Sequence, residues 1–297
     1  MNVYWNEQYC ASATHFETFK KSRVIVDRIA LKRSVSSRVA IKDPSDTPGA
    51  LQLAQQLIQD NLTPEYYRAV TTGEPRGLAK TNGFTWDEGI WQHVLHSTAG
   101  ILCAIDDVSD NGEMRACSLS SGLHHARPNE GKGWCTVNSL AIGALYARKA
   151  GRIVVLDLDA HCGGGTTRHI KGTGVLQIDL STKDYDSYEL SETDDGSVLL
   201  MADADDYFDK LSSSLDALTA AKPDIVLYNA GVDVYPLLTE RQVHDREVVV
   251  AEHLRGLGCK TVLVMAGGYG DYTTIADMHV ATIAAFVDES GALQRSN

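Results

Sequence analysis

The chain has 297 residues, of which 43% are hydrophobic and 22% are charged, proportions that are ordinary for a globular protein with a full core. Its net charge of -12 disfavours nucleic acid as a direct partner. The same charge mildly favours cationic substrates, although solubility alone also explains it. No apolar run reaches the roughly 18 residues of a membrane span, and the N-terminus lacks the basic and apolar regions of a secretory signal.

The six cysteines are scattered along the chain and form no CxxC pair. This spacing argues against a disulfide framework and against a zinc site built from cysteines. It favours reduced thiols in a cytoplasm-like compartment, so we expect a cytoplasmic protein. No feature of the sequence indicates an oligomeric state.

Short apolar segments alternate with longer amphipathic ones along the whole chain. This alternation predicts an α/β fold with a mostly parallel central sheet and helices on both faces. No linker divides the pattern, so we expect residues 1–297 to form a single domain. The expected strands are 3–5, 116–119, 153–156, 175–178, 225–228 and 261–265, and the expected helices lie near 49–60, 85–107, 137–150, 203–221, 239–257 and 273–287.

Helix boundaries are indicated at a few positions. Thr85 and Glu88 have the spacing of a capping box, which predicts a helix start. Gly151 and Gly258 follow two amphipathic segments and predict helix ends. The polar stretch 23–48 predicts a surface loop.

The segment Asp157-Leu158-Asp159-Ala160-His161 directly follows the apolar run 153–156. An extended chain would place Asp157, Asp159 and His161 on one side, at the end of a buried strand. Burying two carboxylates and an imidazole without a partner is costly, so a positive group should lie among them. A divalent metal is the simplest candidate, and these ligand types suit zinc or a neighbouring first-row metal.

Three other expected strands also end in polar side chains. His124 and His125 come after 116–119, Asp233 after 225–228 and Tyr269 after 261–265. Because ligands of open α/β sheets bind beyond the carboxyl ends of the strands, we expect these groups to meet at one edge.

These groups together suggest a hydrolytic metal centre. Asp159, His161 and Asp233 would supply three protein ligands and leave one position open, as in catalytic zinc sites. An open zinc ion polarises carbonyls and acidifies bound water. His124 and His125 could move protons, and Tyr269 could donate a hydrogen bond to an oxyanion. The chemistry that these roles predict is hydrolysis of an amide.

Over residues 60 to 285 the sequence resembles the zinc-dependent histone deacetylases and their bacterial relatives, the acetylpolyamine amidohydrolases among them. The resemblance implies the arginase-deacetylase α/β fold and hydrolysis of acetyl-lysine in a peptide or of an acylated amine. The segments that carry it are Gly83-Phe84 with Trp86, GLHHARPNEGKGWCTVN (122–138), DLDAHCGGGT (157–166), NAGVD (229–233) and AGGY (266–269).

The resemblance also implies residue roles. Asp159, His161 and Asp233 match zinc ligands, and Tyr269 matches the tyrosine that stabilises the transition state. His124 and His125 match the tandem histidines that act as acid and base, and Asp157 matches the carboxylate that orients the first of them and holds potassium. Gly133 and Trp134 match the pair that lines the acyl-lysine tunnel, and Gly268 matches a substrate-binding position. Asp179 takes the position of a second residue at the monovalent cation. Tyr185 and Tyr188 are candidate aromatic residues of the rim.

Two positions depart from the family pattern. Asp179 stands where the cation site of relatives often has Ser, which would strengthen or rearrange binding of the monovalent ion. Gly164 stands where relatives carry the Asp or Asn that pairs with the second histidine. Without that partner we expect the pKa of His125 to lose an upward influence, and activity or its pH optimum to change.

Three alternatives stay open. Gly164 would suit a non-catalytic acyl-lysine-binding or scaffold protein. An acetylpolyamine amidohydrolase would use the same fold and the same chemistry. An arginase-like hydrolase with two manganese ions is disfavoured, because the order Asp157-x-Asp159-x-His161 differs from Asp-x-His-x-Asp and Tyr235 follows Asp233 where a second acid would be needed.

Overall fold

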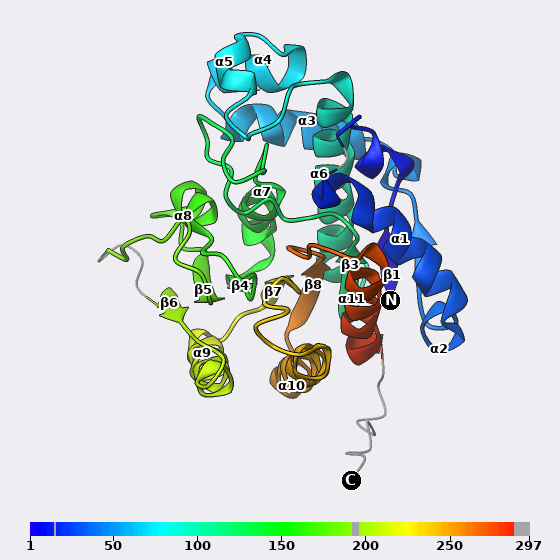
Figure 1. The fold of residues 1–297 in the computed structure, drawn as a ribbon, viewed down its shortest axis with the longest axis vertical. Coiled ribbons are helices and arrows are strands. Elements are labelled where there is room, and N and C mark those ends of the chain that lie inside the picture. Colours follow the sequence, from blue (N-terminus) through cyan, green and yellow to red (C-terminus); the bar gives the residue numbers. More distant parts are fainter. Residues whose placement is uncertain (15, 192–195, 288–297) are drawn as a thin grey trace.

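The structure is a computed structural model that describes every residue except 15, 192–195 and 288–297. Its centre is an eight-stranded parallel sheet with the order β2-β1-β3-β8-β7-β4-β5-β6, so the expected α/β fold is confirmed (Figure 1). The strands are β1 (Asn2–Tyr4), β2 (Ala40–Lys42), β3 (Arg115–Ser118), β4 (Ile153–Asp157), β5 (Leu176–Ser181), β6 (Val198–Met201), β7 (Ile225–Asn229) and β8 (Lys260–Val264).

The middle strands β4, β7 and β8 are buried along most of their length and mostly apolar because helices cover the sheet on both faces. In β4, Val154 and Leu156 pack into one hydrophobic cluster, while Ile153 and Val155 pack into the other. This alternation follows from the two-residue period of an extended chain. All six expected strands are present, whereas the two edge strands β2 and β6, which are exposed or half-buried, were not predicted.

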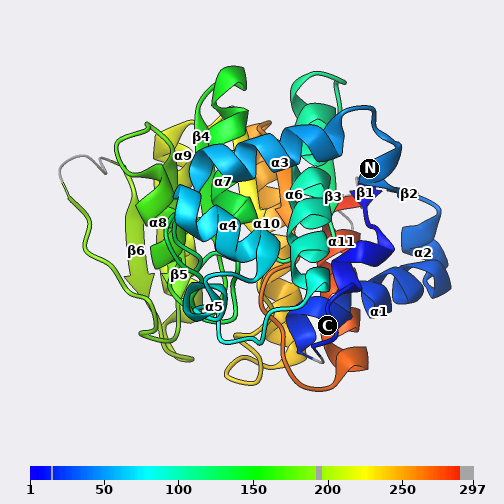
Figure 2. The same cartoon turned by 90° about the horizontal axis from the view of Figure 1, so that it is seen from above.

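Helices form a layer on each face of the sheet: α6 and α7 lie on one side of the strands and α9 and α10 on the other (Figure 1), and the view from above looks onto the layer that contains α6 and α7 (Figure 2). On one face α6 contacts β1, β3 and β8, and α7 contacts β4 and β7; on the other face α9 contacts β4, β5 and β6. The helices are α1 (Glu17–Leu31), α2 (Arg33–Ser36), α3 (Ala50–Asn61), α4 (Pro64–Thr72), α5 (Arg76–Ala79), α6 (Glu88–Ser109), α7 (Ser139–Ala147), α8 (Gly164–Ile170), α9 (Tyr207–Ala221), α10 (Glu240–Leu257) and α11 (Tyr272–Val287).

Two local expectations are wrong. The stretch 23–48 is not a loop, because it contains most of α1, all of α2 and β2; α1 packs along α11, and its Ile25 and Ile29 are buried. The capping box at Thr85 and Glu88 does not form, since α6 begins at Glu88 after Asp87 without a side-chain cap. A capping box forms instead at the start of α10, between Thr239 and Gln242.

The topology brings the polar strand ends together. β3, β8, β7 and β4 are consecutive neighbours in the sheet, so the segments that follow them emerge side by side at one edge. Among the described residues, no helix has both the length and the apolar character needed to cross a membrane.

Candidate active site

Asp159, His161 and Asp233 meet beyond the ends of β4 and β7. Each offers one ligand atom, and these atoms lie within 4.8 Å of one another. His161 Nδ1 is 3.1 Å from Asp159 Oδ1 and 3.0 Å from Asp233 Oδ2. In the part of the chain that the structure describes, this is the one group of three or more His, Cys, Asp or Glu residues arranged to hold a metal ion.

The two carboxylates of this cluster are almost fully buried. Burial favours the neutral form of Asp159, but His124 and His161 outweigh it and hold the pKa of Asp159 well below its usual value. Burial and the charge of Asp159 raise the pKa of Asp233. Asp233 Oδ2 is buried, and apart from the 3.0 Å approach of His161 Nδ1 it has no hydrogen-bond partner among the described residues. A cation among the three side chains would offset the repulsion and satisfy that oxygen, so the residues fit a divalent metal.

Backbone amides fix the remaining carboxylate oxygens. Gly267 N donates to Asp159 Oδ2 at 2.9 Å, and Ala160 N donates to Asp233 Oδ1 at 2.9 Å. The fully buried Arg246 supports the same region from α10, donating to the carbonyl of Leu158 at 3.1 Å and also to that of Gly231. The role of Arg246 could not be predicted from the sequence, because nothing in its helical context distinguishes it from a surface arginine.

His124 and His125 are both buried at the floor of the site. Their Nε2 atoms are 3.2 Å apart, so both rings face the same point. His124 Nδ1 donates to Asp157 Oδ2 at 2.8 Å, and its Nε2 lies 3.5 Å from Asp159 Oδ1. Burial disfavours the charged ring of His124, but Asp157 and Asp159 outweigh it and raise its pKa to about 10. Burial and the charge of His124 lower the pKa of His125 to about 4.

Asp157 is placed by β4 and is fully buried. Besides His124, it accepts a hydrogen bond from Asn229 Nδ2 at 2.8 Å. Asp179 stands beside it in register on β5 and accepts hydrogen bonds from Ser181 Oγ at 2.6 Å and Gly163 N at 2.7 Å. Burial and the neighbouring Asp157 raise the pKa of Asp179 to about 7. A cation beside this pair would favour the ionised form of both side chains.

The second histidine has a carboxylate partner that the sequence analysis missed. His125 Nδ1 donates to Asp186 Oδ2 at 3.2 Å, and the Asp186 side chain is only 2% exposed. The expectation that His125 lacks such a partner because of Gly164 is therefore wrong, and this hydrogen bond acts upward on the pKa of His125. The sequence offered no signal, since Asp186 lies 61 residues from His125 in an irregular segment.

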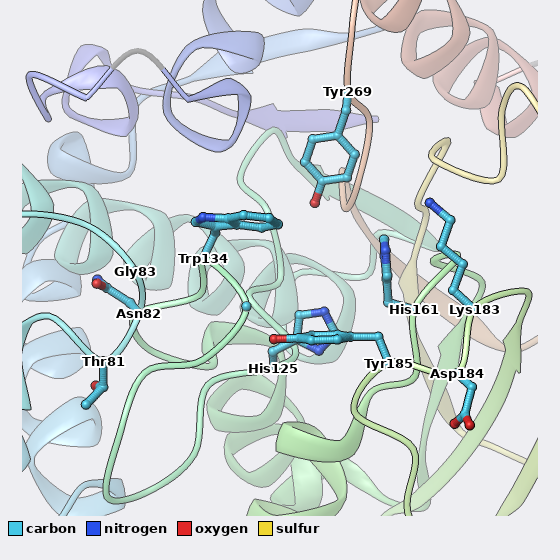
Figure 3. Close-up of a pocket in the computed structure, with 11 residues that line it drawn as sticks. Thr81, Asn82, Gly83, His125, Trp134, His161, Lys183, Asp184, Tyr185 and Tyr269 are labelled. Carbon is cyan, nitrogen blue, oxygen red and sulfur yellow. The ribbon is translucent and has the colours of Figure 1, made fainter.

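A pocket of about 520 Å³ opens above the cluster and the histidines (Figure 3). Trp134, Tyr185 and Tyr269 frame it, and His125 and His161 lie at its inner end. The backbone of the neighbouring Gly133 has φ +54°, and a Cβ there would lie 2.7 Å from the His125 ring and 2.9 Å from that of Tyr185. Only glycine lets the chain pass this close to both rings.

Three other residues, Phe16, Gly268 and Tyr188, are not among those that line the pocket. Phe16, which precedes α1, packs on Trp134 with ring centroids 5.0 Å apart and on Tyr269 at 5.8 Å. Gly268 is buried against Val232 and Ile275 and is not among the residues that line the pocket. The interpretation of Tyr188 as a rim residue is wrong, because its hydroxyl is turned inward and donates to Asp179 at 3.2 Å.

Comparison with known proteins shows the family to which this chain belongs. The model of the histone deacetylase domain matches residues 51–285. The chain belongs to the histone deacetylase family. The resemblance inferred from the sequence motifs is thereby confirmed.

Two of the curated proteins that the chain resembles share modest identity with it. An uncharacterized protein of Picosynechococcus is 29% identical over 220 residues, which cover 69% of this chain and 73% of that protein. The acetoin utilization protein AcuC of Staphylococcus aureus is 36% identical over 95 residues, which cover 30% of this chain and 24% of AcuC.

Two solved structures share the fold. An acetylpolyamine aminohydrolase from Burkholderia pseudomallei superposes with a TM-score of 0.73 at 20% identity, covering 96% of this chain and 98% of that one. The HD domain of HDA15 gives a TM-score of 0.77 at 20% identity, covering 98% and 88%.

Proposed function

We propose that this protein is a zinc-dependent deacetylase that hydrolyses the acyl amide of an acetylated primary amine, such as acetyl-lysine in a peptide or an acetylated polyamine. The observation that carries the proposal is the meeting of a carboxylate-histidine cluster, two facing imidazoles and a tyrosine at the inner end of one aromatic pocket. Membership of the histone deacetylase family supports the same chemistry.

Asp159, His161 and Asp233 would hold the zinc ion. Bound there, zinc would polarise the amide carbonyl and lower the pKa of a water molecule. Backbone amides hold one oxygen of each carboxylate, which fixes the orientation in which the other oxygen would meet the ion. With three protein ligands, one coordination position stays open, as catalytic zinc sites require.

The chain's own side chains would then move protons and stabilise charge. His125 accepts the proton of the attacking water through Nε2, and His124, fixed by Asp157, supplies positive charge beside it. The Tyr269 hydroxyl donates to the oxyanion that develops on the carbonyl oxygen. A protonated histidine returns the proton to the departing amine, which completes hydrolysis of the amide bond.

The pocket suits a slender apolar chain that ends in an amide. Gly133 and Trp134 on one side and Tyr185 on another would line the methylene chain of a lysine or a polyamine. We further propose that residues 1–297 form one catalytic domain. Asp157 and Asp179 would contribute to a potassium site, and the scattered cysteines support a cytoplasmic location.

The test is turnover of a panel of acetyl-lysine peptides and acetylated polyamines. We expect free acetate and the deacetylated amine with at least one substrate, loss of turnover after dialysis against a chelator, and its return on adding zinc. Recovery of every substrate intact by the zinc-loaded protein, with an acetylated peptide bound but unchanged, would instead support the binding-protein alternative.

A further inference from the structure

The carboxylate that contacts His125 comes from an unexpected part of the chain. Asp186 follows β5 in an irregular segment, whereas the position expected to supply the partner, Gly164, begins α8. His125 Nδ1 and Asp186 Oδ2 are 3.2 Å apart, and both side chains are almost fully buried. The geometry repeats that of His124 with Asp157, so each histidine of the pair has its own carboxylate.

The segment that carries Asp186 is held firmly against the end of β4. Lys183 N donates to the carbonyl of Ala160 at 2.8 Å, and Cys162 N donates to the carbonyl of Tyr185 at 3.1 Å. Asp186 itself has φ +59°, a left-handed conformation that aspartate tolerates better than most residues. The backbone is thus fixed on both sides of the metal ligand His161.

The second oxygen of Asp186 is also held. Oδ1 accepts a hydrogen bond from Arg127 Nη2 at 3.1 Å and another from the Lys132 ammonium. Both cations come from the loop that follows the histidines and carries Gly133. Because each oxygen has its own partners, the carboxylate has one orientation, and Oδ2 is left facing His125.

Gly164 provides the space that this arrangement needs. A Cβ at position 164 would lie 2.2 Å from the carbonyl oxygen of Asp186 and 2.9 Å from its carboxyl carbon. Any side chain at 164 would therefore displace the segment. The absence of a side chain at position 164 on α8 therefore leaves the space that Asp186 occupies beside His125.

We propose that Asp186 is the positioning residue of His125: it accepts the Nδ1 proton and keeps Nε2 directed at the reacting centre, in place of a residue at position 164. This inference rests on the proposed deacetylase function and specifies how its proton-accepting histidine is oriented. A purely structural reading, in which Asp186 only pairs with Arg127 and Lys132 to hold the loop, is distinguishable by experiment.

The kinetic test compares Asp186→Ala with Asp186→Asn. Asp186→Ala should lower kcat about 100-fold, toward the lower end of what a general base contributes, with little change in KM or zinc content. Asp186→Asn keeps one oxygen for Arg127 and Lys132 but turns an NH2 group toward His125 Nδ1, so it should lower kcat nearly as much as Asp186→Ala while keeping the contacts of the loop. The matched control is Glu189→Gln, an exposed acid of the same segment, which should leave kcat unchanged.

Lys132→Met separates orientation from anchoring. It removes one cation from Oδ1 but leaves the contact between Oδ2 and His125, so its kcat should stay well above that of Asp186→Ala. Equal losses of kcat in Lys132→Met and Asp186→Ala would overturn the proposal in favour of anchoring.

A spectroscopic test does not depend on turnover. Nitrogen-15 NMR of histidine-labelled protein, with the His125 signals assigned from their absence in His125→Asn, should show a protonated Nδ1 in wild type and a shift toward protonated Nε2 in Asp186→Ala. An unchanged tautomer would overturn the proposal even if wild type turned over no substrate. Inactivity of wild type on every substrate would instead contradict the proposed function.

A substitution at position 164 tests the same proposal without removing the Asp186 carboxylate. Gly164→Ala adds only a methyl group, but this group must displace the Asp186 backbone. We expect it to lower kcat and to shift the His125 tautomer in the same direction as Asp186→Ala. Wild-type kcat and tautomer in a folded Gly164→Ala protein would contradict the proposed link between the two positions.

Discussion

At the scale of single residues, Tyr269 contributes the hydroxyl that the proposed reaction requires. The residue is 39% exposed, and its side chain faces the pocket across from His161 and Tyr185 (Figure 3). Tyr269→Phe removes only the hydroxyl and keeps the ring that packs on Phe16. We expect kcat to fall about 10²- to 10³-fold, since loss of one oxyanion donor has effects of that size.

The change should affect kcat rather than KM, because the hydrogen bond strengthens only as charge develops on the carbonyl oxygen. Steady-state kinetics on the best substrate of the panel would measure it, with Tyr67→Phe, a tyrosine outside the pocket, as control. Equal kcat values for Tyr269→Phe and wild type would remove Tyr269 from the mechanism.

The residues of this site differ in how far the sequence could predict them. Asp157, Asp159 and His161 directly follow an apolar strand, so their meeting with groups from neighbouring strands follows from the parallel topology. Asp186 could not be found in this way. It depends on a left-handed backbone, two cations from another loop and the space above Gly164, and no local pattern encodes that combination.

At the scale of elements, a buried histidine joins α6 to the N-terminal segment. His93 bonds through Nδ1 to the carbonyl of Tyr9 at 2.6 Å, and its ring packs against Phe19 at a centroid distance of 4.6 Å. Burial lowers the pKa of His93 to about 4, from 6.5 in an exposed histidine. The native protein therefore keeps this ring neutral at pH values where the unfolded chain binds a proton.

Because the pKa is lower in the folded state, His93 supports stability fully above pH 6.5, and this contribution is lost as the pH falls from 6.5 toward 4. Between pH 7 and pH 5 the loss amounts to about 2 kcal/mol. When the pH is lowered from 7 to 5, the free energy of unfolding measured with urea should fall by about 2 kcal/mol less in His93→Gln than in wild type. An identical pH dependence in both proteins would contradict the buried neutral ring.

The elements themselves were predictable where burial is complete. The strands β4 and β7 begin as fully buried apolar runs, and the long helix α10 alternates buried and exposed residues with a helical period, so their positions follow from the pattern. Helix α1 was missed because its many charged residues mask the buried positions Ile25 and Ile29. The edge strand β2 is short, exposed and without an apolar run, so its pairing with β1 determines it. The other edge strand, β6, is a four-residue apolar run that was missed because it is short and only half-buried or exposed.

At the scale of the whole molecule, the sheet places the site. Its order makes β3, β8, β7 and β4 adjacent, and the segments after these strands supply both histidines, Tyr269, Asp233 and the Asp159–His161 pair. No single element contains the site. A change that shifts one strand relative to the next would separate ligands that are far apart in sequence, so folding and metal binding should be coupled.

The central claim is that Asp159, His161 and Asp233 together bind one divalent ion. Elemental analysis of protein loaded with zinc and then freed of unbound metal should give about one zinc per chain, the stoichiometry of a single-metal catalytic site. Asp159→Ala and Asp233→Ala should retain almost none, while Glu252→Gln, an exposed acid on α10, should match wild type. Zinc-free wild-type protein, or full zinc occupancy in both aspartate variants, would contradict the account.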